Sequence, residues 1–354
     1  MRRAIALAAR ALGSTSPNPP VGAVVLDAAG RVAGEGFTAP AGGPHAEVTA
    51  LRQAGARARG GTAVTTLEPC NHEGRTPPCT GALMEAGVVR VVYAVDDPVP
   101  GHGRGAAALR AAGLEVESGL LEAEAARGNE AWLLAVRRGR PFVTWKYGAS
   151  LDGRVAARDG SSRWVTGDES RADAHRLRAE SDAVVVGSGT MRVDDPQLAV
   201  RHAEVCRQPL RVVVDTEART PGTARVLDGA APTLIAVADD ADARHLEERV
   251  EVARLPRAAE GLDLNVLLQT LYARGVRSVL LEGGPTLAGS FLASGLVDRV
   301  VAYIAPALIG GGGVSALAGA GAPSIGAAWR LRLDEVARVG SDVRLVARPV
   351  DTSG

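Results

Sequence analysis

The sequence predicts an α/β protein made of two domains. Its 354 residues exceed the usual size of one domain, and apolar runs typical of buried strands alternate with helical patterns along the chain. A helical pattern runs up to Arg137 and is followed by Gly139, Arg140 and Pro141. Because glycine and proline break helices, we expect the helix to end here. We therefore expect a first domain over residues 1–140 and a second over residues 141–354.

The first half of the chain predicts a single α/β unit. An apolar stripe over residues 2–12 favours a helix, and a proline-rich loop over 14–20 leads into an apolar strand. The elements that follow alternate in type. We expect strands over 21–26, 62–66, 88–95 and 114–117, and helices over 45–54, 79–86, 106–112 and 120–136.

The second half alternates in the same way but lacks the Gly-x-Gly-x-x-Gly fingerprint of dinucleotide-binding Rossmann domains. Two glycine-bearing turns, over 187–190 and 282–286, each precede a predicted helix start, where backbone N–H groups bind phosphates. Either turn alone is a weak signal, because such turns are common between strand and helix. The expected strands, several of them parallel, are 183–186, 212–214, 233–237, 279–281 and 300–304, and the expected helices are 169–180, 240–250, 264–274 and 286–295.

Charge and cysteine content limit the classes of function. Lys+Arg and Asp+Glu both number 40, so the chain has no cationic footprint for nucleic acid. No apolar run approaches the length of a membrane span. The 3 cysteines do not make a disulfide framework and suit a reducing cytosol. We expect a soluble, cytoplasmic homo-oligomer that acts on a small molecule and binds neither nucleic acid nor membrane.

The strongest chemical signal lies between His45 and Cys79. His45, Cys70 and Cys79 can supply one imidazole and two thiolates to zinc, which leaves a fourth position open for water. Glu47 follows the histidine by two residues, within reach of that water. His-x-Glu followed by Pro-Cys-x-x-Cys is the signature of zinc nucleobase deaminases, although eight residues separate the two cysteines here. The alternatives are a structural zinc site or unrelated buried cysteines, and the combined spacing favours catalysis.

The segment Glu68–Cys79 closely resembles the zinc site of the bifunctional deaminase–reductases of riboflavin biosynthesis. Segments Ser16–Ala23 and Ser150–Arg154 are similar to the same family, and the resemblance extends from Met1 to about Val346. It implies a cytidine-deaminase-like three-layer domain followed by a dihydrofolate-reductase-like α/β domain. It also implies one Zn²⁺ per chain, NADPH, and a substrate that is a diaminopyrimidinone carrying a phosphoribosylamino group.

The resemblance implies roles for individual residues. In the deaminase, Glu47 transfers protons and Asn18 pairs with the pyrimidine, while His72 and Arg75 lie in the insert between the cysteines. For His72 we favour a supporting or phosphate-binding role over metal ligation. In the reductase, the implied cofactor-binding residues are Ala149, Trp164, Thr190, Asp194, Thr216, Gly284, Pro285, Thr286, Leu287, Ala288, Gly289 and Ser290. The implied substrate-binding residues are Ser162, Arg178, Leu198, Arg201 and Glu282.

Other interpretations stay open at this point. Thr38 follows Gly36-Phe37, where the family often has histidine, and this departure leaves room for a paralogue that deaminates a different heterocycle. A binding module with an inactive zinc site is a third hypothesis, which the presence of the proton-transfer glutamate and all three ligands disfavours. From the residues alone, a solvated charge is the favoured interpretation of Arg201, and a core aromatic is the alternative for Trp164.

Lys146 is the single lysine among the 40 Lys+Arg residues, and we assign it to the substrate site. A compact ammonium fits where the guanidinium fork does not, although chance also explains a lone lysine. We predict that Lys146→Arg impairs reduction and spares deamination, measured as NADPH oxidation and ammonia release. Unchanged reductase activity in the variant would contradict this role.

Overall fold

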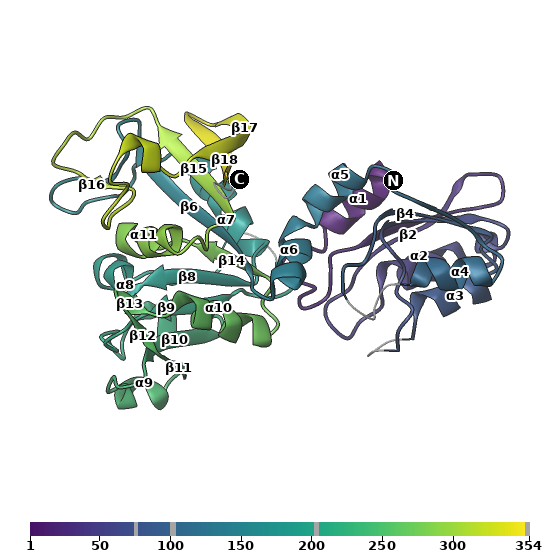
Figure 1. Cartoon of the computed structure of the whole chain (residues 1–354), viewed down its shortest axis with the longest axis horizontal. Helices are drawn as coiled ribbons and strands as arrows, with labels where there is room; N and C mark the ends of the chain where they lie inside the picture. Colours follow the sequence, from purple (N-terminus) through teal and green to yellow (C-terminus); the bar gives the residue numbers. More distant parts are fainter. Residues whose placement is uncertain (74–76, 100–103, 202–204, 351–354) are drawn as a thin grey trace. The chain divides into compact units, whose positions relative to one another are not determined.

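The computed structural model describes residues 1–73, 77–99, 104–201 and 205–350. The chain divides into two compact units, Met1–Pro141 and Phe142–Gly354 (Figure 1). The division falls in the Gly-Arg-Pro segment, one residue beyond the boundary expected from the sequence. Arg75 lies outside the described residues.

Unit 1 is a three-layer α/β domain around a five-stranded sheet of order β2-β1-β3-β4-β5. Strand β1 is antiparallel to β2 and β3, whereas β3, β4 and β5 are parallel. The strands are β1 (Gly22–Leu26), β2 (Val32–Phe37), β3 (Thr62–Leu67), β4 (Arg90–Val95) and β5 (Glu115–Ser118). The helices are α1 (Arg2–Ala9), α2 (Ala46–Ala54), η1 (Gly55–Ala58), α3 (Cys79–Glu85), α4 (Gly105–Ala111), α5 (Glu122–Gly128) and α6 (Glu130–Arg138).

Glycines in β2 let helix α2 lie directly on the sheet. A Cβ added at Gly34 would lie 2.1 Å from the carbonyl oxygen of Ala50, and one at Gly36 would lie 2.4 Å from that of Ala46. Only glycine permits so close an approach of helix and strand. On the opposite face Ala4 of α1 packs against Val24, so both faces of the sheet are covered.

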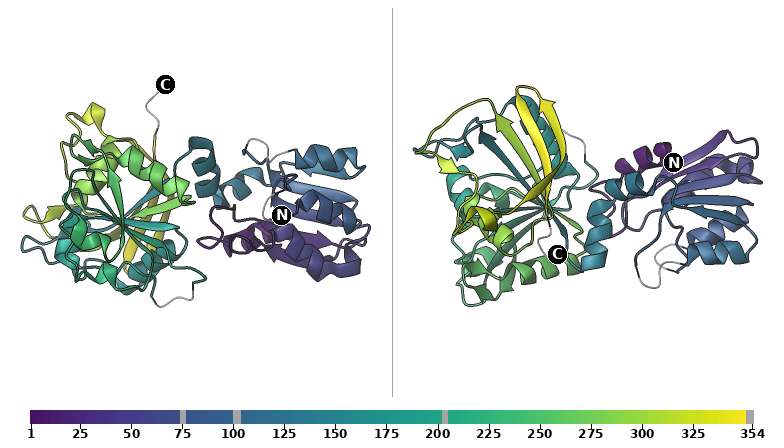
Figure 2. Two further views of the ribbon diagram at one scale, coloured as in Figure 1. Left: turned by 90° about the horizontal axis from the view of Figure 1, so that it is seen from below. Right: turned by 45° about the horizontal axis from the view of Figure 1, so that its top comes forward.

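Unit 2 is built on a nine-stranded sheet of order β11-β10-β9-β8-β14-β6-β15-β18-β17. Neighbouring strands from β11 to β15 are parallel, and β18 and β17 complete the sheet as an antiparallel hairpin (Figure 2). The sheet strands are β6 (Phe142–Ser150), β8 (Ala183–Gly187), β9 (Leu210–Val214), β10 (Thr233–Ala238), β11 (Glu251–Leu255), β14 (Ser278–Leu281), β15 (Arg299–Ala305), β17 (Leu331–Val339) and β18 (Asp342–Pro349).

Short elements surround this sheet. Two small antiparallel pairs are β12 (Arg257–Ala258) with β13 (Gly261–Leu262) and β7 (Arg154–Ala156) with β16 (Val314–Ser315). The helices are α7 (Asp168–Ala179), α8 (Ser188–Asp194), η2 (Arg225–Leu227), α9 (Arg244–Glu247), α10 (Leu264–Ala273), α11 (Pro285–Ala293) and η3 (Ile325–Ala327).

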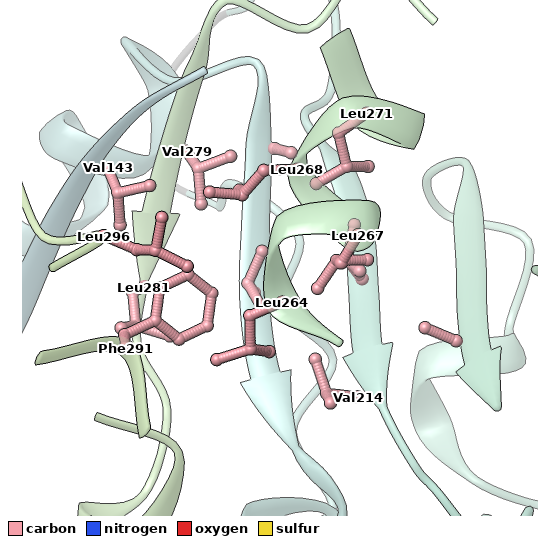
Figure 3. Packing of buried hydrophobic residues seen from close by; sticks show 14 of the residues in the cluster. Val143, Val214, Leu264, Leu267, Leu268, Leu271, Val279, Leu281, Phe291 and Leu296 are labelled. Carbon is pink, nitrogen blue, oxygen red and sulfur yellow. The ribbon is translucent and has the colours of Figure 1, made fainter. Parts of the chain in front are cut away.

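The largest core of unit 2 lies where α10 and α11 pack on the sheet (Figure 3). Leu267 of α10 and Phe291 of α11 are fully buried among the strand residues Val143 and Leu281. Burial of this apolar surface stabilises the parallel sheet from this side. It also fixes the starts of both helices beside the carboxyl ends of the strands.

The predicted extents of two helices were wrong. The helix expected over 120–136 is two helices, α5 and α6, because Asn129 has a non-helical backbone with φ −114°. The helix expected over 240–250 shortens to Arg244–Glu247, and Glu251–Leu255 instead pairs with β10 as a parallel strand. Within the described ranges, no helix combines the length and apolar character needed to cross a membrane.

Candidate active sites

The three zinc-ligand candidates of unit 1 meet at one point. His45 immediately precedes α2, Cys70 follows β3, and Cys79 begins α3. Nδ1 of His45 lies 3.2 Å from Sγ of Cys79 and 3.6 Å from Sγ of Cys70, and the ligand atoms all lie within 4.8 Å of one another. One imidazole and two thiolates form the ligand set of a zinc site that keeps a position open. The side chains present therefore fit zinc.

Backbone contacts hold the two cysteines together despite the insert between them. The N–H of Cys79 donates to Sγ of Cys70 at 3.4 Å, and the N–H of Thr80 donates to the carbonyl of Cys70 at 3.3 Å. The Cys79 thiol donates to Cys70, which lowers the pKa of Cys70 to about 4 and raises that of Cys79. A bound zinc ion would take the place of this shared proton, since cysteine ligates the metal as the thiolate.

Glu47 lies beside the three ligands without joining them. It occupies the first turn of α2 and is 5% exposed. Burial raises the pKa of its carboxyl group, a shift that favours a group able both to accept and to return a proton. His72 is half-buried and is not one of the residues whose ligand atoms converge.

The loop that carries Asn18 is held at its end by Thr38. The hydroxyl of Thr38 accepts from the N–H of Val21 at 3.0 Å, and Thr38 is 3% exposed. The next residue, Ala39, donates its N–H to the carbonyl of Pro44, directly before His45. Thr38 thus uses its hydroxyl to join the Asn18 loop to the segment that carries the zinc ligand.

A cavity of ≈ 650 Å³ opens along the carboxyl ends of the unit 2 strands. Such an edge is the usual ligand site of an open α/β sheet. The cavity surface includes many of the residues that the sequence predicted for the reductase site. Those residues are Lys146, Ser162, Thr190, Asp194, Thr216, Glu282, Gly284, Pro285, Thr286, Leu287 and Ser290.

Other predicted residues do not line this cavity. Ala149, Leu198 and Ala288 are buried in the protein, and Gly289 lies against the carbonyl of Ala318, so close that a Cβ would be 1.9 Å away. The Trp164 side chain is 68% exposed and stacks beneath the guanidinium of Arg171 at 4.4 Å. Two further residues predicted for the reductase site also lie outside the cavity lining. They are Arg201, which is exposed, and Arg178, which is largely buried.

A buried ion pair fixes the charge on the cavity wall. Arg178 donates from Nε and Nη2 to the two carboxylate oxygens of Glu282 at 3.0 and 2.9 Å. Burial opposes ionisation of Glu282, but the charges of Arg178 and Lys146 outweigh it and hold its pKa at about 2. Arg178 itself does not line the cavity. It acts on the cavity by orienting Glu282, which lines the wall together with Lys146.

Sequence reasoning missed several cavity residues. Arg192 follows Thr190 on α8, and a helical spacing from the glycine turn would have indicated it. Glu260 and Gly261 come from the β12–β13 turn, a segment without any motif. Val314 and Ala316 come from a glycine-rich segment that carries no chemical signal.

Comparisons with known proteins match both units. A model of the cytidine and deoxycytidylate deaminase zinc-binding region matches residues 1–95, and the RibD C-terminal domain matches residues 141–345. Riboflavin biosynthesis protein RibD of Mycobacterium tuberculosis is 48% identical over 95% of this chain and 93% of its own length. The chain belongs to the RibD family.

Solved structures of RibD proteins agree with this assignment over the whole chain. RibD of Acinetobacter baumannii has a TM-score of 0.90 at 40% identity and covers 99% of this chain and 98% of its own. A deaminase/reductase of Thermotoga maritima has a TM-score of 0.89 at 35% identity, with 99% and 97% covered. The chain is a bifunctional enzyme of riboflavin biosynthesis, with a zinc-dependent deaminase half and an NADPH-type reductase half. The deaminase-like and reductase-like fold classes expected from the sequence are confirmed.

We predict that Cys79→Ala abolishes zinc binding, because the two donors that remain, His45 and Cys70, cannot hold the ion as three donors do. Zinc content, measured by atomic absorption, should fall from about one per chain to near zero. Cys206→Ala is the matched control, since Cys206 is exposed and lies outside the ligand cluster. Retention of zinc by the Cys79 variant would exclude this cluster as the metal site.

Proposed function

We propose that this chain deaminates 2,5-diamino-6-(5-phosphoribosylamino)pyrimidin-4(3H)-one and then reduces the product with NADPH to 5-amino-6-(5-phosphoribitylamino)uracil. The Thermotoga maritima relative is a diaminohydroxyphosphoribosylaminopyrimidine deaminase/5-amino-6-(5-phosphoribosylamino)uracil reductase, which supports these substrates. The observation that carries the proposal is the convergence of His45, Cys70 and Cys79 beside Glu47 in unit 1. The cavity of unit 2 supports the second step.

For the deamination step, His45, Cys70 and Cys79 would hold zinc, which when bound would supply a nucleophile from water near neutral pH. Glu47 takes the proton from that water and returns it to the departing amine, so that ammonia leaves. The raised pKa of this buried carboxyl suits such two-way transfer. Asn18 pairs with the pyrimidine edge, and its side chain makes no other hydrogen bond within the described ranges.

For the reduction step, NADPH, when bound in the cavity, would supply a hydride to the opened ribose. The chain supplies the accompanying proton, and Lys146 is the cavity ammonium that can donate it. The carboxylate of Glu282, held by Arg178, attracts this ammonium electrostatically. Gly284 ends the turn before α11, where free backbone N–H groups can bind cofactor phosphates. The residues assigned to NADPH and substrate by resemblance remain part of this proposal.

We predict that Glu47→Gln lowers the rate of ammonia release by about 10²–10⁴-fold, because the amide cannot transfer the proton. Wild type and variant are assayed first for ammonia and then, with the deaminated product supplied, for NADPH oxidation. The reductase rate of the variant should equal that of wild type. Wild-type protein that binds zinc but releases no ammonia from this pyrimidine would refute the substrate and favour another heterocycle.

We also propose that the chain acts in the cytoplasm. Cys70 and Cys79 are unpaired and are needed as thiolates, a chemistry that suits a reducing compartment. Oxidation to a Cys70–Cys79 disulfide would remove two of the three zinc ligands.

We propose further that the chain is a homo-oligomer that associates through one face of the β17–β18 hairpin. Leu331, Leu333 and Val336 on the outermost strand are 44%, 59% and 62% exposed. A bulge between Leu333 and Glu335 places Val336 on the same face, which continues across β18 to Val343 at 39% exposure. An edge strand with this much exposed apolar surface is typical of an interface, and a second copy would cover it.

We predict that Leu333→Glu reduces the mass measured by sedimentation velocity to that of the monomer. A buried, unpaired carboxylate at the interface would oppose association. Arg332→Glu is the control on the opposite face of the same strand and should leave the mass unchanged. A monomeric wild type, or an unchanged mass for Leu333→Glu, would remove this face as the interface.

A further inference from the structure

The motif Ser150–Arg154 contributes no residue to the zinc cluster or to the cavity lining, yet hydrogen bonds join its residues to one another. Ser150 is fully buried, and its hydroxyl donates to Oδ1 of Asp152 at 2.5 Å. The N–H of Arg154 donates to the same hydroxyl at 3.0 Å. Gly153 provides the positive φ of 76° that this tight turn requires. The Asp152 carboxylate is therefore held in one orientation.

That carboxylate binds a segment more than 150 residues away in the sequence, residues 307–316, which we call the strap. The N–H of Ile309 donates to Oδ1 of Asp152 at 3.1 Å, and the N–H of Gly310 donates to Oδ2 at 2.6 Å. Two successive backbone N–H groups directed at one anion form a small anion-binding nest. Bonds from Ser150 and from these N–H groups lower the pKa of Asp152 to about 2, so it is charged near neutral pH.

The rest of the motif bonds to the same strap. Leu151 donates its N–H to the carbonyl of Ala307 at 2.8 Å, and Gly153 accepts from the N–H of Ala316 at 3.1 Å. The side chain of Arg154 donates to the hydroxyl of Ser315 at 2.5 Å. Strand β16 within the strap also pairs with β7, which begins at Arg154. These contacts secure the strap at both of its ends.

The strap lies against its neighbours too closely for side chains at some positions. A Cβ at Gly313 would lie 2.7 Å from Cγ2 of Ile309 and 2.8 Å from the carbonyl oxygen of Ala156. Gly310, whose N–H reaches Asp152, has φ +90°. The consecutive glycines therefore allow residues 310–313 to lie flat on the turn, and these four residues have no side chains of their own to keep them there. Between its two ends, the strap is held at Ile309 and Gly310 by the Asp152 carboxylate.

The strap matters because it forms part of the reductase cavity. Val314 and Ala316 of the strap line the cavity together with Val155 and Ala156 of β7. A ligand in the cavity would contact these four apolar side chains and, elsewhere on the wall, Lys146 and Glu282. Release of the strap would open that apolar side to water.

We propose that Asp152 is a positioning residue for the reduction step: it holds the strap so that Val314 and Ala316 complete the cavity wall on which NADPH and its substrate bind. This role rests on the proposed reductase function of unit 2. Asn at this position is a poor substitute, because its amide NH₂ would face one of the two backbone donors. Ser150 assists by fixing the carboxylate.

The test compares Asp152→Asn and Asp152→Ala with wild type in the full-length, zinc-loaded chain. For both variants we expect kcat/KM of NADPH-dependent reduction to fall by about tenfold, the loss expected for a charge-assisted hydrogen bond, mainly through higher KM values. Ammonia release by unit 1 should not change. Hydrogen–deuterium exchange should accelerate in peptides that cover the strap and remain unchanged in α10 and β9. Asp242→Asn is the control, because this exposed carboxylate caps a turn away from the cavity lining and should change neither quantity.

Three outcomes would overturn the proposal. Unchanged kinetics with unchanged exchange would mean that Asp152 does not hold the strap. Faster strap exchange with unchanged KM would mean that the strap does not serve the cavity. Faster exchange throughout unit 2 in Asp152→Asn would mean that the residue supports the fold in general. If wild type itself oxidises no NADPH, the reductase assignment fails, a result that the wild-type reaction alone reveals.

Discussion

Both active sites depend on the fact that parallel strands of one sheet end at the same edge. In unit 1 the parallel strand β3 delivers Cys70 to this edge, and helix α3 then begins with Cys79. In unit 2 the parallel strands β8, β9 and β14 end beside the cavity, although about a hundred residues separate the first from the last. Residues distant in the sequence therefore meet without long loops.

Two buried glutamates show how their surroundings give one residue type two different roles. Glu47 pairs with no arginine among the described residues, and burial raises its pKa, so it can exchange a proton. Glu282 is paired with Arg178 at both oxygens and stays ionised. Its fixed negative charge can hold a cation such as the Lys146 ammonium but cannot serve as an acid near neutral pH. Neighbouring charges, rather than burial alone, decide between these roles.

The zinc ligands could be predicted from the sequence because His45 and Cys79 lie at predicted helix starts, Cys70 follows a predicted strand, and the three have a recognisable spacing. The cavity was only partly predictable. Glycine turns indicated the segment around Gly284, but Glu260 and Val314 reach the cavity through hairpin pairing, which leaves no local signal. The pairing of Arg178 with Glu282 joins positions 104 residues apart and depends on the tertiary fold. The break at Asn129 was missed because the helical pattern continues through it.

The composition of the chain makes its reductase cavity chemically distinct from the rest of the surface. Lys146 is the single lysine, and it lines the cavity. An acylating reagent that reacts with primary amines therefore has only this side chain and the amino terminus as targets. Trypsin would still cleave at the many arginines, so mass spectrometry could quantify the labelled peptide. Protection of that peptide would report occupancy of the cavity directly, without an engineered probe.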